Sequence, residues 1–240
     1  EGRGDAQHEV VVAEQQKRLG AILIERRPLS EPQPQAVRAA MIAGVRSLSL
    51  QVLPWTEPAR QWQAGLESLR AWRLGEDWPD VSESALLARL EDWLAPFLDG
   101  VTRRDHLARL NLMDILHSQL DYAQQQQLAR LAPTHLDVPS GSRVALEYST
   151  AAAPPVLAVK LQELFGLART PTVNDGRNPV LIHMLSPGRH PVAVTQDLAG
   201  FWARGYADVK KDMKGRYPRH PWPDDPLAAT ATRRAKPRGT

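Results

Sequence analysis

The chain has 240 residues, 42% of them hydrophobic and 24% charged, a composition typical of a globular protein with one or two domains. It contains no cysteine, which excludes disulfide bonds, thiolate zinc sites and cysteine nucleophiles and fits the reducing cytoplasm, where we expect the protein to act. No apolar run is long enough for a membrane span, so no membrane insertion is expected. The net charge of +3 is uneven, because residues 201–240 hold ten Lys and Arg against four Asp. Such a basic end is typical of a surface that meets a polyanion and also of a solvated tail, and both interpretations stay open.

Residues 1–33 predict a β-hairpin and a linker. Two short β-type runs, 10–12 and 21–25, flank the polar stretch 14–18, and prolines follow at 28 and 32. A lone hairpin is marginally stable in water, so we expect it to be the trailing edge of a sheet that precedes it. Because the chain also begins with Glu1 instead of Met, we expect it to be a piece of a longer polypeptide.

Residues 34–132 predict a helical array, because apolar residues recur at helical spacing. Thr56 is a candidate N-cap for a helix at 57–69, and Asp80 with Glu83 forms a capping-box pattern ahead of an amphipathic helix that Pro96 ends. Further helical segments are predicted at 37–48, from 102, at 112–120 and at 124–131.

Residues 133–226 predict a small α+β domain in the order β-β-α-β-β-α, with a mixed or antiparallel sheet and helices on one face. The first hairpin turns at 139–142 and is followed by a helix at 154–165. The second turns at 186–189 and is followed by a helix that Thr195 caps and Gly215 ends. Residues 227–240 predict a disordered basic tail. The helical array and the sheet domain together make α+β the expected fold class of the whole chain.

Chemical motifs are scarce. Neither GxxxxGK[ST] nor GxGxxG occurs, and we expect no catalytic residue, metal site or cofactor in this chain. Residues 138–143 could form an anion nest, although a plain hairpin turn is favoured. Asp114, His117 and Asp121 lie on adjacent turns of one helix face, a pattern more typical of a solvated helix than of a metal site.

The strongest functional signal is the basic, aromatic end of the last predicted helix. Its cations can neutralise phosphates, and its rings can either stack on unpaired bases or fix the chain to the rest of the domain; both roles stay open. Arg143 and Arg189 lie at the two hairpin turns and would add to this surface if they shared its face. The candidate nucleic-acid-binding residues are Arg143, Arg189, Lys210, Lys211, Lys214, Arg216, Tyr217, Arg219 and Trp222.

Five long segments, including LPWTEPARQWQAGLESLR (53–70) and WPDVSESALLARLEDWLAPFLDGV (78–101), resemble the C-terminal region of the bacterial HrpB family of ATP-dependent helicases. The other three segments are 131–149, 154–171 and 194–238. The family is similar to the DEAH-type RNA helicases. The resemblance implies RecA-like, winged-helix, helical-bundle and OB-like domains upstream, with ATP and Mg²⁺ bound there by P-loop and DExH motifs that this chain lacks. It also makes the hairpin a candidate edge of the OB-like domain.

The sequence therefore predicts a non-catalytic C-terminal accessory region of an ATP-dependent helicase that binds RNA or other single-stranded nucleic acid and meets the upstream domains of the same polypeptide. The alternative is a protein-interaction module that docks the helicase on a partner complex. An exposed apolar patch at Trp55, Trp62 or Trp72 would favour that alternative.

Overall fold

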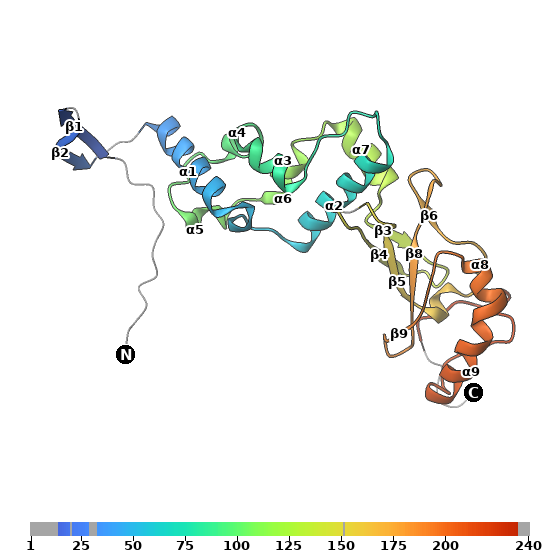
Figure 1. Ribbon diagram of the computed structural model, residues 1–240. Helices are drawn as coiled ribbons and strands as arrows, with labels where there is room; N and C mark the ends of the chain where they lie inside the picture. The colour runs from blue at the N-terminus through green and yellow to red at the C-terminus, as the bar shows by residue number, and fades with distance from the viewer. Residues whose placement is uncertain (1–13, 20, 29–32, 151, 235–240) are drawn as a thin grey trace, which may run out of the picture. The chain divides into compact units, whose positions relative to one another are not determined.

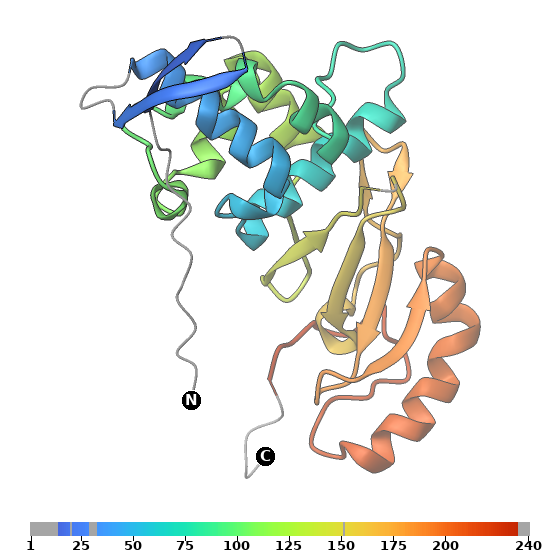
Figure 2. The same cartoon turned by 60° about the vertical axis from the view of Figure 1, so that its left-hand side comes forward.

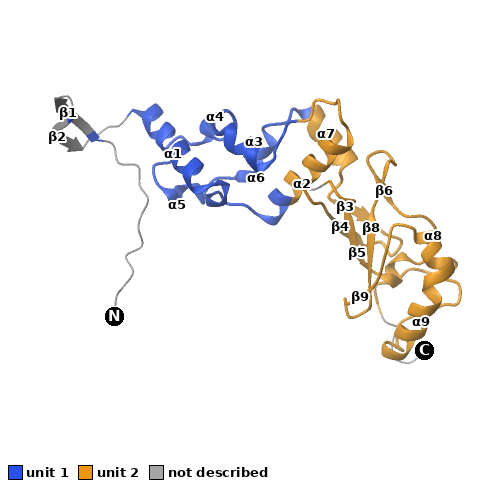
Figure 3. Ribbon diagram, in the orientation of Figure 1, with its two compact units in different colours: residues 1–60, 79–122 blue, residues 61–78, 123–240 orange. Residues whose placement is uncertain are grey.

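The computed structural model describes residues 14–19, 21–28, 33–150 and 152–234 (Figure 1). A β-hairpin is followed by a helical region and then by a small sheet with helices, so the predicted α+β class is confirmed. The chain divides into two compact units (Figure 3). The first comprises residues 1–60 and 79–122, and the second comprises residues 61–78 and 123–240.

This division differs from the expected boundary between residues 132 and 133. The second unit takes in most of α2 (Glu57–Trp72) and α7 (Tyr122–Leu131) together with the sheet. Polar contacts explain the grouping, because the Gln61 Oε1 atom accepts a hydrogen bond from the Tyr148 amide at 2.8 Å. The Ser68 hydroxyl donates to the Ser149 carbonyl at 3.1 Å.

The first unit begins with an antiparallel hairpin of β1 (Glu14–Leu19) and β2 (Ile22–Pro28). The predicted strand at 10–12 lies outside the described residues. The polar stretch 14–18, predicted as a connection, is itself a strand. Its backbone pairs with β2, and main-chain pairing does not require apolar side chains.

The first unit has a long helix, α1 (Pro34–Leu48), followed by short ones. The short helices are α3 (Glu83–Ala88), α4 (Leu90–Trp93), α5 (Arg104–Leu107) and α6 (Leu112–His117), with 3₁₀ turns η1 (Leu50–Val52) and η2 (Ala95–Phe97). The predicted helix up to residue 94 is interrupted at Arg89, whose φ of −114° separates α3 from α4. The N-cap of α3 is Ser82, whose hydroxyl accepts a hydrogen bond from the Ala85 amide. Asp80, the predicted capping residue, instead accepts a hydrogen bond from the Ser82 amide, ahead of the helix.

The second unit is built on a five-stranded sheet in the order β3-β4-β5-β8-β9. The strands are β3 (His135–Asp137), β4 (Arg143–Glu147), β5 (Val156–Lys160), β8 (Leu181–Leu185) and β9 (Pro191–Thr195). Strands β5 and β8 are parallel, and the other neighbours are antiparallel. A separate ribbon pairs β6 (Thr172–Val173) with β7 (Asn178–Pro179).

The prediction of a helix at 154–165 is wrong. The first half of this segment is the central strand β5, in which Leu157 and Val159 are buried, and its second half is the 3₁₀ turn η3 (Leu161–Leu164). Leu157 is buried in the strand and Leu161 in the turn that follows it, and their separation of four positions also matches the spacing of a helix face. The sheet domain therefore gains a strand and loses a helix relative to the prediction.

The last helix has three parts, α8 (Leu198–Gly200), the π-helical turn η4 (Phe201–Gly205) and α9 (Tyr206–Arg216). Asp197 caps it by accepting from the Gly200 amide at 2.8 Å, so the predicted cap at Thr195 is wrong by two residues. Its other end is also later than predicted, because the helix passes Gly215 and Tyr217 is the C-cap. Figure 2 shows this helix beside the sheet.

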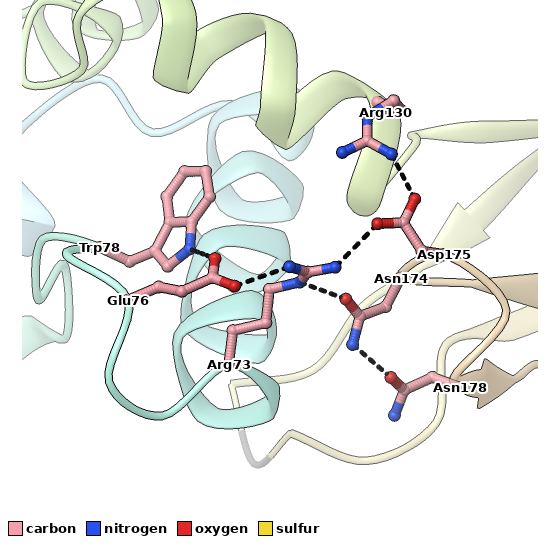
Figure 4. A network of polar contacts seen from close by, with 7 residues as sticks. All are labelled: Arg73, Glu76, Trp78, Arg130, Asn174, Asp175 and Asn178. Atoms are coloured by element: carbon pink, nitrogen blue, oxygen red, sulfur yellow. Dashed lines mark hydrogen bonds and ion pairs between the residues drawn. The ribbon is translucent and has the colours of Figure 1, made fainter.

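A polar network joins the end of α2, the end of α7 and the β6–β7 turn (Figure 4). The Arg73 guanidinium donates to Asn174 Oδ1 at 2.5 Å, to Glu76 Oε1 at 2.7 Å and to Asp175 Oδ2 at 2.9 Å. Arg130 pairs with the other oxygen of Asp175. The network fixes a turn in which Asn174 and Asp175 both have φ near +54°, a conformation unusual for residues other than glycine.

The predicted disorder of the tail is wrong as far as residue 234. The segment 226–234, which we call the C-terminal strap, is hydrogen-bonded to the second unit at two points. The Gly166 amide donates to the Pro226 carbonyl at 3.0 Å, and the Thr232 amide donates to the Gln162 carbonyl at 3.0 Å. Residues 235–240 lie outside the described residues. None of the helices in the described part of the chain combines the length and hydrophobicity needed to cross a bilayer.

Candidate nucleic-acid interface

The strand pairing places Arg143 and Arg189 at the same end of the sheet. Strand β4 is antiparallel to β5, with Leu146 opposite Leu157, so its start at Arg143 lies toward the end of β5 at Lys160. Strand β8 is parallel to β5, with Lys160 opposite Leu185, so the turn that carries Arg189 follows at that same end. We call this end, where β4 and β9 start and β5 and β8 finish, the basic sheet end.

The end of α9 packs against the same turn. A pocket of about 230 Å³ lies between them, lined on one side by Ser186, His190, Pro191 and Val192 and on the other by Val209, Asp212, Met213, Arg216 and Tyr217. The Tyr217 hydroxyl lies 3.4 Å from the Ser186 hydroxyl. Arg189 and Arg216, which are 27 positions apart in the printed sequence, are thereby brought to one region of the second unit.

Six of the seven predicted cations are exposed to solvent, namely Arg143, Arg189, Lys211, Lys214, Arg216 and Arg219. Arg216 lies 3.4 Å from Asp212 on the same helix, a weak exposed pair. Lys210 is the exception, because it pairs with Asp224 and only 18% of its side chain is exposed. The hydrogen bond from Lys210 holds the pKa of Asp224 below its usual range. Lys210 therefore ties α9 to the following loop through this ion pair and is poorly placed to bind a ligand.

The two predicted rings are half-buried, and their polar groups are used inside the fold. The Trp222 indole donates to the Tyr217 carbonyl at 2.9 Å, and the His220 amide donates to the same carbonyl at 3.1 Å. The Tyr217 and His220 rings meet edge to face at 6.1 Å between centroids. These contacts favour the anchoring role that the sequence left open, over stacking on bases.

Lys160 is a cation of this region that the sequence prediction missed. It ends β5, and its charge, together with that of Arg219, lowers the pKa of His220, an effect that comes after the larger one of burial. The end of β5 is therefore electrostatically coupled to the loop after α9. The prediction of a helix at 154–165 hid this position, and recognising the strand would have placed Lys160 beside the second turn.

The turn at residues 138–142 already holds an internal anion. Glu163, a largely buried residue at 9% exposure, accepts a hydrogen bond from the Ser140 hydroxyl at 2.8 Å and another from the Ser142 hydroxyl. The favoured interpretation of a hairpin turn agrees with this geometry. A phosphate would have to displace the Glu163 carboxylate from the two hydroxyls.

No group of three His, Asp or Glu able to hold a metal occurs among the described residues, and this includes Asp114, His117 and Asp121. The binding of ATP and Mg²⁺ by upstream domains stays a prediction from the family resemblance.

Comparisons with known proteins identify the family of the chain. The family model described as ATP-dependent helicase C-terminal, HrpB_C, matches residues 93–226, more than half of the chain. The ATP-dependent RNA helicase HrpB of Escherichia coli (strain K12) is 42% identical over 218 residues, which cover 91% of this chain and 27% of that protein.

Two solved structures are also similar. The crystal structure of the E. coli DExH-box NTPase HrpB superposes with a TM-score of 0.82 at 39% identity, covering 95% of this chain and 30% of the other. The structure of the Escherichia coli DEAH/RHA helicase HrpB gives 0.71 at 37% identity, with 90% and 28% covered. The chain thus spans between a quarter and a third of the length of these relatives. It belongs to the family of HrpB-type ATP-dependent helicase C-terminal regions.

Proposed function

We propose that this chain is a non-catalytic accessory region of an ATP-dependent RNA helicase and that its basic sheet end binds the phosphate backbone of single-stranded RNA. The observation that carries the proposal is the convergence of cations from separate segments. Arg143 starts β4, Lys160 ends β5, Arg189 lies in the β8–β9 turn, and α9 adds its own cations nearby. Lys and Arg gathered in this way neutralise phosphates and release counterions from the strand.

The contacts support binding to phosphates without reading of bases. The Trp222 indole is held by its hydrogen bond to the Tyr217 carbonyl, and the Tyr217 ring lies close against Gly188. Base stacking requires a free aromatic face, and base readout requires free donors and acceptors on the protein. We therefore expect affinity that depends strongly on salt and little on sequence.

RNA is the first strand to test, because the curated relative is named an RNA helicase. In the whole polypeptide, the chain would meet the upstream RecA-like and OB-like domains, the upstream P-loop and DExH motifs would supply the ATP- and Mg²⁺-dependent steps, and the basic sheet end would hold or guide the strand. This role would be exercised in the cytoplasm. DNA of the same length is the comparison that tests how far the preference for RNA extends.

The test is fluorescence anisotropy with a labelled single-stranded RNA of mixed sequence. Replacing Arg189, Lys211 and Lys214 together by Ala should weaken binding at least about tenfold at moderate salt. The matched control replaces Arg103, Arg104 and Arg109 of the first unit by Ala, which removes the same charge and should change affinity much less. Absent binding by the wild type, or equal losses in both triple variants, would refute the proposal.

The three tryptophans at which an exposed apolar patch would favour the docking alternative are covered or bonded within the fold. Trp62 is buried, and the Arg60 guanidinium covers the Trp55 ring at 3.8 Å from its centroid. The half-buried Trp72 donates its indole N–H to the Ala152 carbonyl at 3.3 Å. These three residues therefore give no support to a protein-docking surface.

A further inference from the structure

We propose that the C-terminal strap (226–234) is a fixed part of the nucleic-acid interface and that it places Arg233 and Arg234 at the basic sheet end to bind phosphates. This inference rests on the function proposed above and extends it to a segment beyond the region that the family model matches, which ends at residue 226.

The strap is anchored at its start by backbone contacts. The Pro226 carbonyl accepts from the Gly166 amide, and Pro226 itself is buried. Gly166 has a φ of +81°, and a side chain there would lie 3.8 Å from the carbonyl oxygens of Leu227 and Ala229. Asp225 Oδ1 also accepts from the Leu227 and Ala228 amides at 2.9 and 3.2 Å. The chain therefore leaves the loop after α9 in a defined direction.

The other anchor fixes the strap to the end of β5. The Thr232 amide donates to the carbonyl of Gln162, which lies only two residues beyond Lys160. Figure 2 shows the strap, drawn in red, passing the end of the sheet. Since Lys160 belongs to the basic sheet end, the anchor brings the residues that follow Thr232 to the same region.

A local turn then fixes the two arginines. The Thr232 hydroxyl accepts from the Arg234 amide at 3.1 Å, so the backbone from Thr232 to Arg234 is closed on itself. Both Arg233 and Arg234 are exposed. Docking a segment before the ligand arrives removes the ordering cost that a disordered basic tail has to meet on binding. The strap cations should therefore act as part of a preformed surface.

The decisive experiment compares four variants for binding to the same single-stranded RNA. Replacing Arg233 and Arg234 by Ala removes the charges and should weaken binding about three- to tenfold. The slope of the logarithm of the association constant against the logarithm of salt concentration should also become shallower by about 1.4, for two lost phosphate contacts. Thr232→Pro keeps the charges but removes the amide that donates to Gln162, and it should weaken binding by a similar factor. Ending the chain after Arg234 should leave affinity nearly unchanged. The control for the double arginine variant is Arg103→Ala with Arg109→Ala in the first unit, which removes the same charge.

The outcomes separate this inference from the function on which it rests. If the wild type does not bind RNA, the proposed function fails. If the wild type binds and loses affinity with Arg189, Lys211 and Lys214 replaced, but not with Arg233 and Arg234 replaced, only the role of the strap fails. A loss in the arginine variant without a loss in Thr232→Pro would show that the charges act from an undocked tail, which also overturns the inference. Hydrogen exchange at the Thr232 amide, slow in the wild type, checks docking without a ligand.

Discussion

The α-carbon of Gly188 faces the hydroxyl of Tyr217 so closely that a methyl group at residue 188 would lie 2.6 Å from that oxygen. The turn that carries Arg189 is thus packed against the C-cap of α9. Gly188→Ala should lower the free energy of unfolding by about 1–2 kcal/mol, because the added carbon overlaps an atom held on a rigid ring. Urea denaturation measures the effect.

Two further variants test this relationship. Removing the hydroxyl with Tyr217→Phe in the Gly188→Ala background should restore most of the loss, giving a coupling in the double-mutant cycle. Gly215→Ala is the control, since nothing lies within 4 Å of a side chain added there and the residue is helical. That change should stabilise α9 by about 0.5–1 kcal/mol. Additive effects of the two changes at 188 and 217 would contradict the packing.

Arg73 is the centre of the polar network in the second unit, with 10% of its side chain exposed. Arg73→Ala removes bonds to Asn174, Glu76 and Asp175, and it leaves the buried Asn174 without that donor. We expect the free energy of unfolding to fall by about 2–3 kcal/mol. Arg130→Ala, whose side chain is 61% exposed, should cost at most about 1 kcal/mol. Equal effects in denaturation would contradict the central place of Arg73.

His220 should make the second unit less stable in acid. Burial, together with the charges of Lys160 and Arg219, lowers its pKa in the folded state, whereas the unfolded chain keeps the ordinary value near about 6.5. At a pH between the folded-state pKa and the ordinary pKa, the unfolded chain binds more protons than the folded chain. The contribution of His220 to the free energy of unfolding is therefore complete above the ordinary pKa and is lost as pH falls toward the folded-state pKa. The melting temperature of His220→Gln should fall less on acidification than that of the wild type, and Arg219→Gln should lie in between. Parallel curves for all three proteins would refute this.

Lys210 should differ in function from its neighbours on α9. It pairs with Asp224 and is largely covered, whereas Lys211 and Lys214 are exposed. Lys210→Ala should change RNA affinity by less than about twofold, while Lys211→Ala with Lys214→Ala should weaken it several-fold. Anisotropy titrations at one salt concentration are sufficient. A loss in Lys210→Ala as large as in the double variant would place Lys210 in the interface.

Features set by neighbouring residues could be predicted from the sequence. The Thr56 hydroxyl accepts from the Ala59 amide at 3.3 Å, as its position before the helix indicated. The two hairpin turns and their arginines were also found, because turn residues act over a few positions.

Features set by residues distant in the chain could not be predicted from the sequence. Strand β5 is central and pairs in parallel with β8, and such strands lack the polar alternation that identifies a strand at a surface. The Lys210–Asp224 pair joins residues 14 positions apart, and the strap depends on a bond between Thr232 and Gln162. The strap is also short and poor in large apolar residues, which in sequence is typical of disorder.

The salt dependence of RNA binding tests the central claim most directly. The logarithm of the association constant is measured against the logarithm of salt concentration between about 50 and about 200 mM, for the wild type and for the variant with Arg189, Lys211 and Lys214 replaced by Ala. We predict a wild-type slope of about −3 or steeper, and a slope about 2 units shallower in the variant, since each single-strand phosphate contact contributes about 0.7. A slope near zero, or an identical slope in the two proteins, would contradict a phosphate-binding surface at the basic sheet end.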